Sequence, residues 1–185
     1  MGSTTATSPA PVRRLLTGVS AAGKSAIVED AQAKAVRTIP ERPGYRSSEI
    51  WVTEGSPAPI GQADLVGKVG GVSPPKGGSI LRIIDIPPES KDPAERERSI
   101  RATFAKLYSD ADHRADSKVH PGMHITDTVD YALIISGEIW AVMEEGETLM
   151  KAGDVLIQRG TNHAWANRSD DFCRIAFILL DGKRS

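Results

Sequence analysis

One stretch decides the fold: GDVLIQRGTNHAWAN, residues 153–167. It opens with a glycine and a short apolar run, and Gly160 stands three residues before His163. Short apolar runs that are bounded by turn residues are typical of β-strands. The stretch therefore predicts two strands joined by a turn, with His163 at the start of the second strand.

The same pattern continues on both sides of this stretch, over residues 120–182. Closely spaced apolar runs alternate with turns that contain Gly, Asp or Ser, which is typical of antiparallel sandwiches and barrels. The sequence therefore predicts an all-β core here. The predicted strands are 124–136, 138–144, 148–151, 154–158, 163–167 and 173–180.

Four residues of this core have a predicted structural role. Gly137, Gly153 and Gly160 stand between the predicted strands, where a turn needs a positive φ angle that glycine adopts without strain. Asn167 ends its strand, and we expect it to brace the loop that follows. Trp165 lies on the strand in between, and it is expected to line a cavity or to contact a substrate.

Residues 12–119 predict further strands and one helix that pack on this core. The helix is expected at about residues 93–108, with Asp92 as N-cap, Pro93 at its first position and Glu95 completing a capping box. Residues 1–11 are rich in Ser, Thr, Ala and Pro, and predict a disordered tail. The strands expected in this part are 12–17 and 24–29, which form a hairpin, and 49–53, 64–69 and 79–86.

Length and composition exclude several classes of protein. The chain has 185 residues, a net charge of −1 and a single cysteine, Cys173. One domain with additions is expected at this length. A DNA- or RNA-binding module needs a basic excess, and a membrane span needs about 20 apolar residues in a row, so we expect neither partner. One cysteine excludes an intrachain disulfide, and a cytoplasmic location is expected.

A polar row on one predicted strand marks the candidate site. Side chains alternate along a strand, so His124, Thr126, Thr128 and Asp130 share one face of residues 124–136. With His163 on a neighbouring strand, two imidazoles and one carboxylate come together. This set is typical of non-haem Fe(II) sites, and Mn, Ni, Co and Zn use it as well. We therefore expect His124, Asp130 and His163 to hold one divalent transition metal, with Fe(II) favoured.

The spacing of these residues resembles that of the cupin superfamily. In its second motif a glycine, an apolar run, Pro-x-Gly, two residues, His, three residues and Asn follow one another. Gly153, Gly160, His163 and Asn167 match this order, and Gln158 stands at the proline position. The resemblance covers about residues 120–182. It implies a small single-domain protein of the cupin-2 conserved-barrel type, with a jelly-roll β-barrel, a metal in its mouth and pairing into a homodimer.

The first cupin motif, HxH, three or four residues, Glu, six residues and Gly, matches less fully. His124 and Gly137 match, but Thr126 stands at the second histidine and Asp130 at the glutamate. Thr126 and Thr128 are therefore expected to line the cavity without binding the ion. His120 would join the site only if the chain bends at residues 121–122, and we expect it to lie at the surface or to contact substrate instead.

The function that these residues predict is a metal-dependent oxidoreductase or lyase. Its substrate would be a small oxygenated organic molecule, and dioxygenase, decarboxylase, dehydratase and isomerase chemistry all stay open. The missing second histidine keeps open an alternative, a non-catalytic cupin that binds a small molecule. A remote alternative comes from residues 18–25, GVSAAGKS, which match the phosphate-binding loop of nucleotide-binding proteins, with Asp85 as a magnesium ligand.

Overall fold

The computed structural model of the chain describes residues 7–184. Most regular structure in this range is β-strand, and α1 (Pro93–Leu107) is the helix. No helix of the described range has the length and apolar character that crossing a membrane requires. The strands are β1 (Arg13–Val19), β2 (Ser25–Gln32), β3 (Ala35–Thr38), β4 (Arg46–Thr53), β5 (Ser79–Ile86), β6 (Asp112–His113), β7 (His124–Ile125), β8 (Thr128–Ser136), β9 (Glu138–Met143), β10 (Glu147–Lys151), β11 (Val155–Arg159), β12 (His163–Ala166) and β13 (Cys173–Asp181).

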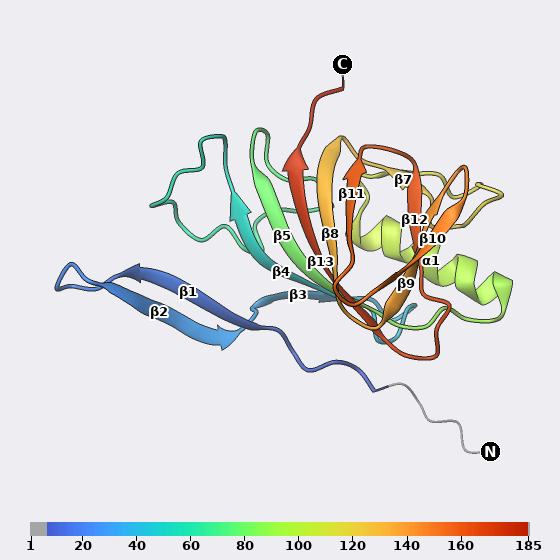
Figure 1. Ribbon diagram of the computed structural model, residues 1–185, viewed down its shortest axis with the longest axis horizontal. Helices are drawn as coiled ribbons and strands as arrows, with labels where there is room; N and C mark the ends of the chain where they lie inside the picture. The colour runs from blue at the N-terminus through green and yellow to red at the C-terminus, as the bar shows by residue number, and fades with distance from the viewer. Residues whose placement is uncertain (1–6, 185) are drawn as a thin grey trace.

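Two antiparallel sheets form the barrel (Figure 1). One has the strand order β10-β9-β12-β7-β6, and the other has the order β11-β8-β13-β5-β4-β3. The predicted all-β jelly-roll barrel with one helix is confirmed in the described residues. β5 pairs with β13 from Cys173↔Ile86 to Leu180↔Ser79, so strands that precede residue 120 belong to the barrel wall as well.

The predicted strand 124–136 is two strands, and this break decides the geometry of the site. β7 pairs with β12 in the five-stranded sheet, whereas β8 pairs with β11 and β13 in the six-stranded sheet. Between them Asp127 leaves the ladder, and its carbonyl accepts a hydrogen bond from the Gly182 N–H at 2.9 Å. The chain therefore crosses from one sheet to the other, and His124 and Asp130 lie on different sheets.

The predicted hairpin is confirmed as β1 and β2, which form a two-stranded sheet of their own. Figure 1 shows this hairpin projecting away from the barrel. Its tip contains Gly23 and Lys24 of the GVSAAGKS stretch, whereas Gly18 lies in β1. A strand follows the tip where a phosphate-binding loop requires a helix. The nucleotide-binding interpretation therefore lacks its structural context.

Part of the predicted tail contacts the barrel. The carbonyl oxygens of Pro9 and Ala10 accept hydrogen bonds from Arg46 at 2.5 and 3.1 Å, and Ala10 also accepts one from Arg174 at 2.6 Å. The disordered-tail prediction for residues 1–11 therefore differs from the structure at these positions, while residues 1–6 lie outside the described range.

The helix begins as predicted. The Asp92 side chain accepts a hydrogen bond from the Ala94 N–H at 3.0 Å, and Pro93 follows it. Glu95 does not close a capping box, because its carboxylate accepts a hydrogen bond from the Ser90 hydroxyl at 2.6 Å instead. The predicted strand at 64–69 is wrong, since these residues form a loop with a turn. Ile100, Thr103 and Leu107 of α1 are buried against the barrel.

Candidate functional site

A cavity of about 90 Å³ lies inside the barrel, and most of its wall is apolar. α1 contributes Phe104 to this wall, and the six-stranded sheet contributes Ile84, Phe177 and Leu179. His124, Asp130 and His163 line the same cavity, together with Thr126 and Trp165. The three predicted ligands therefore face one small and largely apolar space.

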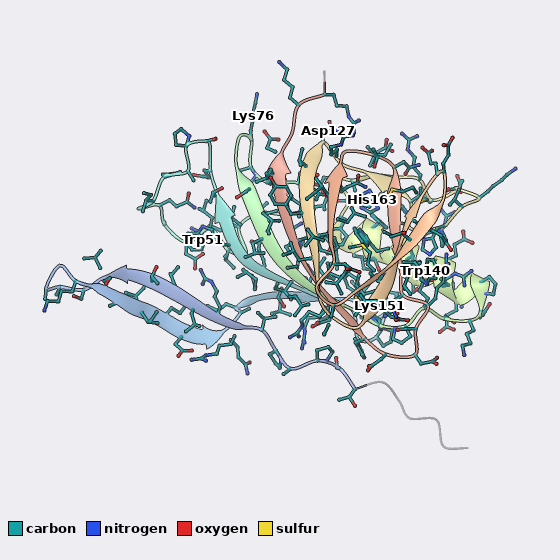
Figure 2. All side chains as sticks on the ribbon, in the orientation of Figure 1. Trp51, Lys76, Asp127, Trp140, Lys151 and His163 are labelled. Carbon is teal, nitrogen blue, oxygen red and sulfur yellow. The ribbon has the colours of Figure 1, made fainter. Side chains whose placement is uncertain are left out.

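The two histidines are neighbours because their strands pair. His163 on β12 is directly opposite His124 on β7, and the centroids of their rings are 4.2 Å apart. Figure 2 places His163 within the barrel and Asp127 at its rim. The convergence of two imidazoles that are 39 residues apart in sequence follows from this single register.

Hydrogen bonds and burial fix the chemical state of both rings. Nδ1 of His124 donates to the Gly122 carbonyl at 2.9 Å, and Nδ1 of His163 donates to the Thr161 carbonyl at 3.0 Å. Burial lowers the pKa of His163 to about 4. Burial, with the neighbouring His163 as a further cause, lowers the pKa of His124 to about 3. At neutral pH both rings are therefore uncharged and carry the proton on Nδ1, which leaves Nε2 of each ring as a lone-pair acceptor.

Asp130 faces the same cavity from β8 and lacks a cationic partner. Its residue surface is 5% exposed, and its Oδ1 atom is buried with no hydrogen-bond partner in the described chain. Burial raises the pKa of Asp130 to about 6, and the Thr128 hydroxyl opposes that shift. An acidic group whose proton is released near neutral pH therefore lies in the pocket with an acceptor oxygen unsatisfied.

The donor set fits a metal ion only in part. Two neutral imidazoles with Nδ1 bound to carbonyl oxygens are in the state that metal-binding histidines adopt. Over residues 7–184, however, no three His, Cys, Asp or Glu side chains form a group that could hold a metal ion. Asp130 extends into the same cavity from the opposite sheet. The three-ligand site and its ion therefore stay a prediction.

The other predicted cavity residues are placed as follows. Trp165 lines the cavity edge-on to the ring of His163, with centroids 5.9 Å apart. Thr126 lines it as well, and its hydroxyl is 2.8 Å from that of Thr128, which does not line this cavity. His120 is buried outside it, where Nε2 donates to Glu89 at 3.0 Å and Nδ1 accepts from the Gly122 N–H at 3.0 Å.

The predicted structural residues behave as expected. Gly137, Gly153 and Gly160 have φ angles of 76°, 96° and 63°. A Cβ atom on Gly137 would lie 2.3 Å from the Phe172 carbonyl oxygen, so that turn admits no side chain. Asn167 is fully buried, and its amide donates to the carbonyls of Ile86 and Asp171, both at 2.9 Å. It therefore ties the loop before β13 to the end of β5.

Sequence reasoning missed a second polar part of the cavity wall. Arg42, Tyr45, Arg82 and Tyr108 also line this cavity. They come from the loop before β4, from β5 and from the end of α1, so no local pattern connects them with the histidines. The one available signal was the alternation along β5, which puts Arg82 on the same face as Ile84 and Ile86.

Sequence comparison identifies relatives of this chain among known proteins. The chain is 35% identical over 115 residues to Phomopsin biosynthesis cluster protein C' of Diaporthe leptostromiformis, which covers 61% of this chain and 45% of that relative. It is 25% identical over 186 residues to the cupin-domain-containing oxidoreductase srdD of Neurospora crassa, which covers 95% of this chain and 80% of that relative. The chain spans about half the length, 39% to 59%, of the curated relatives that match it with the greatest significance.

Solved structures of similar shape include the cupin domain of Schizosaccharomyces pombe Cnp3. It covers 91% of this chain and 87% of its own, with a TM-score of 0.45 and 9% identity. A scan against protein families matches none.

Proposed function

We propose that this chain is an enzyme of the cupin type that binds a small oxygenated organic molecule in its barrel and transfers a proton at Asp130. One observation carries the proposal. A buried carboxyl group without a cationic partner faces two uncharged imidazoles across a small apolar cavity. Buried polar groups are ordinarily satisfied, and groups left unsatisfied in a cleft are candidates for function.

Each polar side chain has a role that its surroundings support. Asp130 changes charge near pH 6, so at neutral pH it can accept a proton from a ligand and return it. Nε2 of His124 and of His163 can each accept a hydrogen bond from a ligand hydroxyl or enol. The apolar wall excludes water and strengthens these interactions. Of the reactions that the sequence left open, dehydration and isomerisation require such a proton transfer.

A probe reaction tests this proposal without knowledge of the natural substrate. The neutral compound 5-nitrobenzisoxazole opens when a base removes the proton on its ring carbon, the N–O bond breaks and a cyanophenolate is released. We expect the wild-type protein to accelerate this reaction with a rate that rises through about pH 6. Asp130→Asn should lower the rate by about 100-fold or more, because general base catalysis contributes that much.

The matched control is Asp127→Asn, which removes an exposed carboxylate that pairs with Arg184 at the rim. This variant should retain the wild-type rate. Equal rates for Asp130→Asn and the wild type would contradict the proposal. Binding of the probe without turnover would favour the alternative, a non-catalytic binding protein.

A second candidate is a metal-dependent oxidoreductase, which is favoured by the paired imidazoles and by the similarity to the cupin-domain-containing oxidoreductase srdD. Its test is metal analysis of protein purified without chelators and after loading with Fe(II), Mn(II), Ni(II) and Zn(II). One ion per chain in the wild type, lost in the His124→Ala/His163→Ala double variant, would support this candidate. No stoichiometric ion, or an ion that the double variant retains, would exclude this site for it.

A further inference from the structure

The Arg42 end of the pocket has a surplus of hydrogen-bond donors. Arg42 is half-buried, and its guanidinium makes no hydrogen bond or ion pair within the described chain. The centroid of the Tyr45 ring is 4.9 Å from the guanidinium carbon, and the charge of Glu89 favours the protonated form of Arg42 without a hydrogen bond to it in the described chain. A guanidinium presents five N–H donors and no acceptor, so the donors of Arg42 are free to bind an anionic ligand.

The two tyrosines beside Arg42 add an unused donor. Their hydroxyl oxygens are 2.9 Å apart, and neither hydroxyl has another partner among residues 7–184. Burial raises the pKa of Tyr45 well above its usual value. Two protonated hydroxyls that share one hydrogen bond leave one O–H free to donate. Both side chains are more than nine-tenths buried and line the cavity.

Arg82 contributes a third donor from β5. It is 1% exposed, and its two terminal nitrogens donate to the carbonyls of Val72 and Gly71, both at 2.8 Å. Its Nε–H is buried without a partner in the described part of the chain. Glu49 lies 3.6 Å from its terminal nitrogen and balances its positive charge, whereas the Arg42 guanidinium has no hydrogen-bonded carboxylate in the described chain.

The His124 end of the pocket lacks hydrogen-bond donors. Oδ1 of Asp130 is an acceptor without a donor in the described chain, and the two uncharged imidazoles lie beside it in the same cavity. Phe104 lies between the two ends, with ring centroids 6.1 Å from Tyr108 and 4.8 Å from His124. A ligand that satisfies both ends carries an anionic acceptor on one side of an apolar middle and a hydroxyl on the other.

We propose that the pocket takes a small hydroxylated carboxylic acid, with its carboxylate bound by Arg42 and the Tyr45–Tyr108 hydroxyl pair and its hydroxyl facing Asp130. The planar fork of a guanidinium matches the two oxygens of a carboxylate. This inference rests on the proposed function for the location of the ligand, and it adds the chemical class of that ligand.

The test uses three probes, 4-hydroxybenzoate, 4-hydroxybenzamide and benzoate, in titration calorimetry at pH 7.5. We expect 4-hydroxybenzoate to bind about 10- to 100-fold more tightly than the amide, which is the ratio that one charge-assisted contact supplies. Benzoate should bind several-fold more weakly than 4-hydroxybenzoate, because it lacks the hydroxyl that would donate a hydrogen bond to Asp130.

Two variants test which side chains cause the preference for the acid over the amide. Arg42→Gln should remove most of the preference for the acid over the amide, and it should fold normally because the half-buried Arg42 side chain makes no hydrogen bond within the described chain. Tyr45→Phe removes the free hydroxyl and should reduce the preference several-fold. Arg98→Gln is the matched control, since Arg98 is exposed on α1, and it should change nothing.

The outcomes separate this inference from the proposed function. Equal binding of acid and amide, an unchanged preference in Arg42→Gln, or no binding of any probe would each overturn the inference. None of these results tests the proton transfer at Asp130, because the neutral benzisoxazole measures that transfer independently. Loss of that reaction's dependence on Asp130 would contradict the proposed function while leaving an Arg42-dependent acid preference in place.

Discussion

Asp85 and Asp130 lie on the two strands that flank β13, and both are buried, with 1% and 5% of their surfaces exposed. Asp85 is bound by Arg46, with Nε and Nη2 at 2.8 and 2.6 Å, and by Arg174, with Nε at 2.6 Å. Asp130 has no cation, and one of its oxygens lacks any partner in the described chain. Both carboxylates are buried, but only Asp85 has cationic partners. We therefore assign Asp85 to stability and regard Asp130 as a candidate functional group.

The position of each residue on its strand explains the difference. Asp85 faces away from the cavity, directly opposite Arg46 on β4 and Arg174 on β13. Asp130 faces the cavity, where its neighbours are apolar residues and uncharged imidazoles. The carbonyls of Pro9 and Ala10 also accept from these arginines, so the N-terminal segment covers the Asp85 cluster.

The largest expected effect is that of Asp85→Asn on stability. Removing the charge leaves two largely buried arginines, each 17% exposed, without their carboxylate. Breaking a buried pair by removing one partner costs about 3 to 5 kcal/mol. Urea denaturation at pH 7 measures this loss, with Asp127→Asn as the control. A loss below about 1 kcal/mol would show that burial alone, and not pairing, distinguishes the two aspartates.

The next effect concerns His163 in acid. Its folded pKa of about 4 lies below its ordinary value of 6.5, so the folded state disfavours the charged ring. Stability is therefore present above pH 6.5 and is lost as the pH falls toward 4, by about 3 kcal/mol. His163→Gln should lack this loss when the free energy of unfolding is followed from pH 7 to 4. Parallel profiles for the two proteins would mean that the ring is not kept neutral.

The effect of Asp130→Asn should have the opposite dependence on pH. Its folded pKa of about 6 lies above the ordinary value of 3.8, so the folded state disfavours the carboxylate. That penalty is absent below pH 3.8 and complete above about pH 6, where it reaches about 2 to 3 kcal/mol. The variant should therefore be more stable than the wild type at pH 7 and equal to it near pH 4, by urea denaturation. A variant that is less stable at pH 7 would contradict the comparison.

The smallest expected effect is that of Arg46→Lys in the Asp85 cluster. Lysine keeps the positive charge but replaces the forked contact by a single ammonium group. We expect a loss of about 1 kcal/mol at pH 7, because Arg174 still binds Asp85. The same denaturation assay checks it, and a loss as large as that of Asp85→Asn would show that Arg174 does not share the charge.

Local patterns were enough to predict most strands of the barrel, the turn glycines and the histidine pair, but not the loop at 64–69. His124 and His163 could be matched because motif spacing reflects strand register. The crossing at Asp127 could not be predicted, since alternation assumes a continuous strand, and this crossing puts Asp130 on the sheet opposite the histidines.

The arginine partners of Asp85 could not be predicted from the sequence for a related reason. Arg46 and Arg174 are 39 and 89 residues from Asp85, and only the pairing of β4 and β13 with β5 brings them together. Arg42 likewise reaches the pocket from a loop. Which charges are paired and which are left unpaired is decided by sheet topology, and a single sequence does not carry that information in its local pattern.

The most direct measurement is the titration of the Asp130 carboxyl carbon by NMR in protein labelled with ¹³C at aspartate. Its signal can be assigned by its absence from the spectrum of Asp130→Asn. We expect a midpoint near pH 6 for this carbon in the folded protein. A midpoint below pH 4 would show that Asp130 is compensated like an ordinary buried carboxylate, and it would contradict the proposed proton transfer.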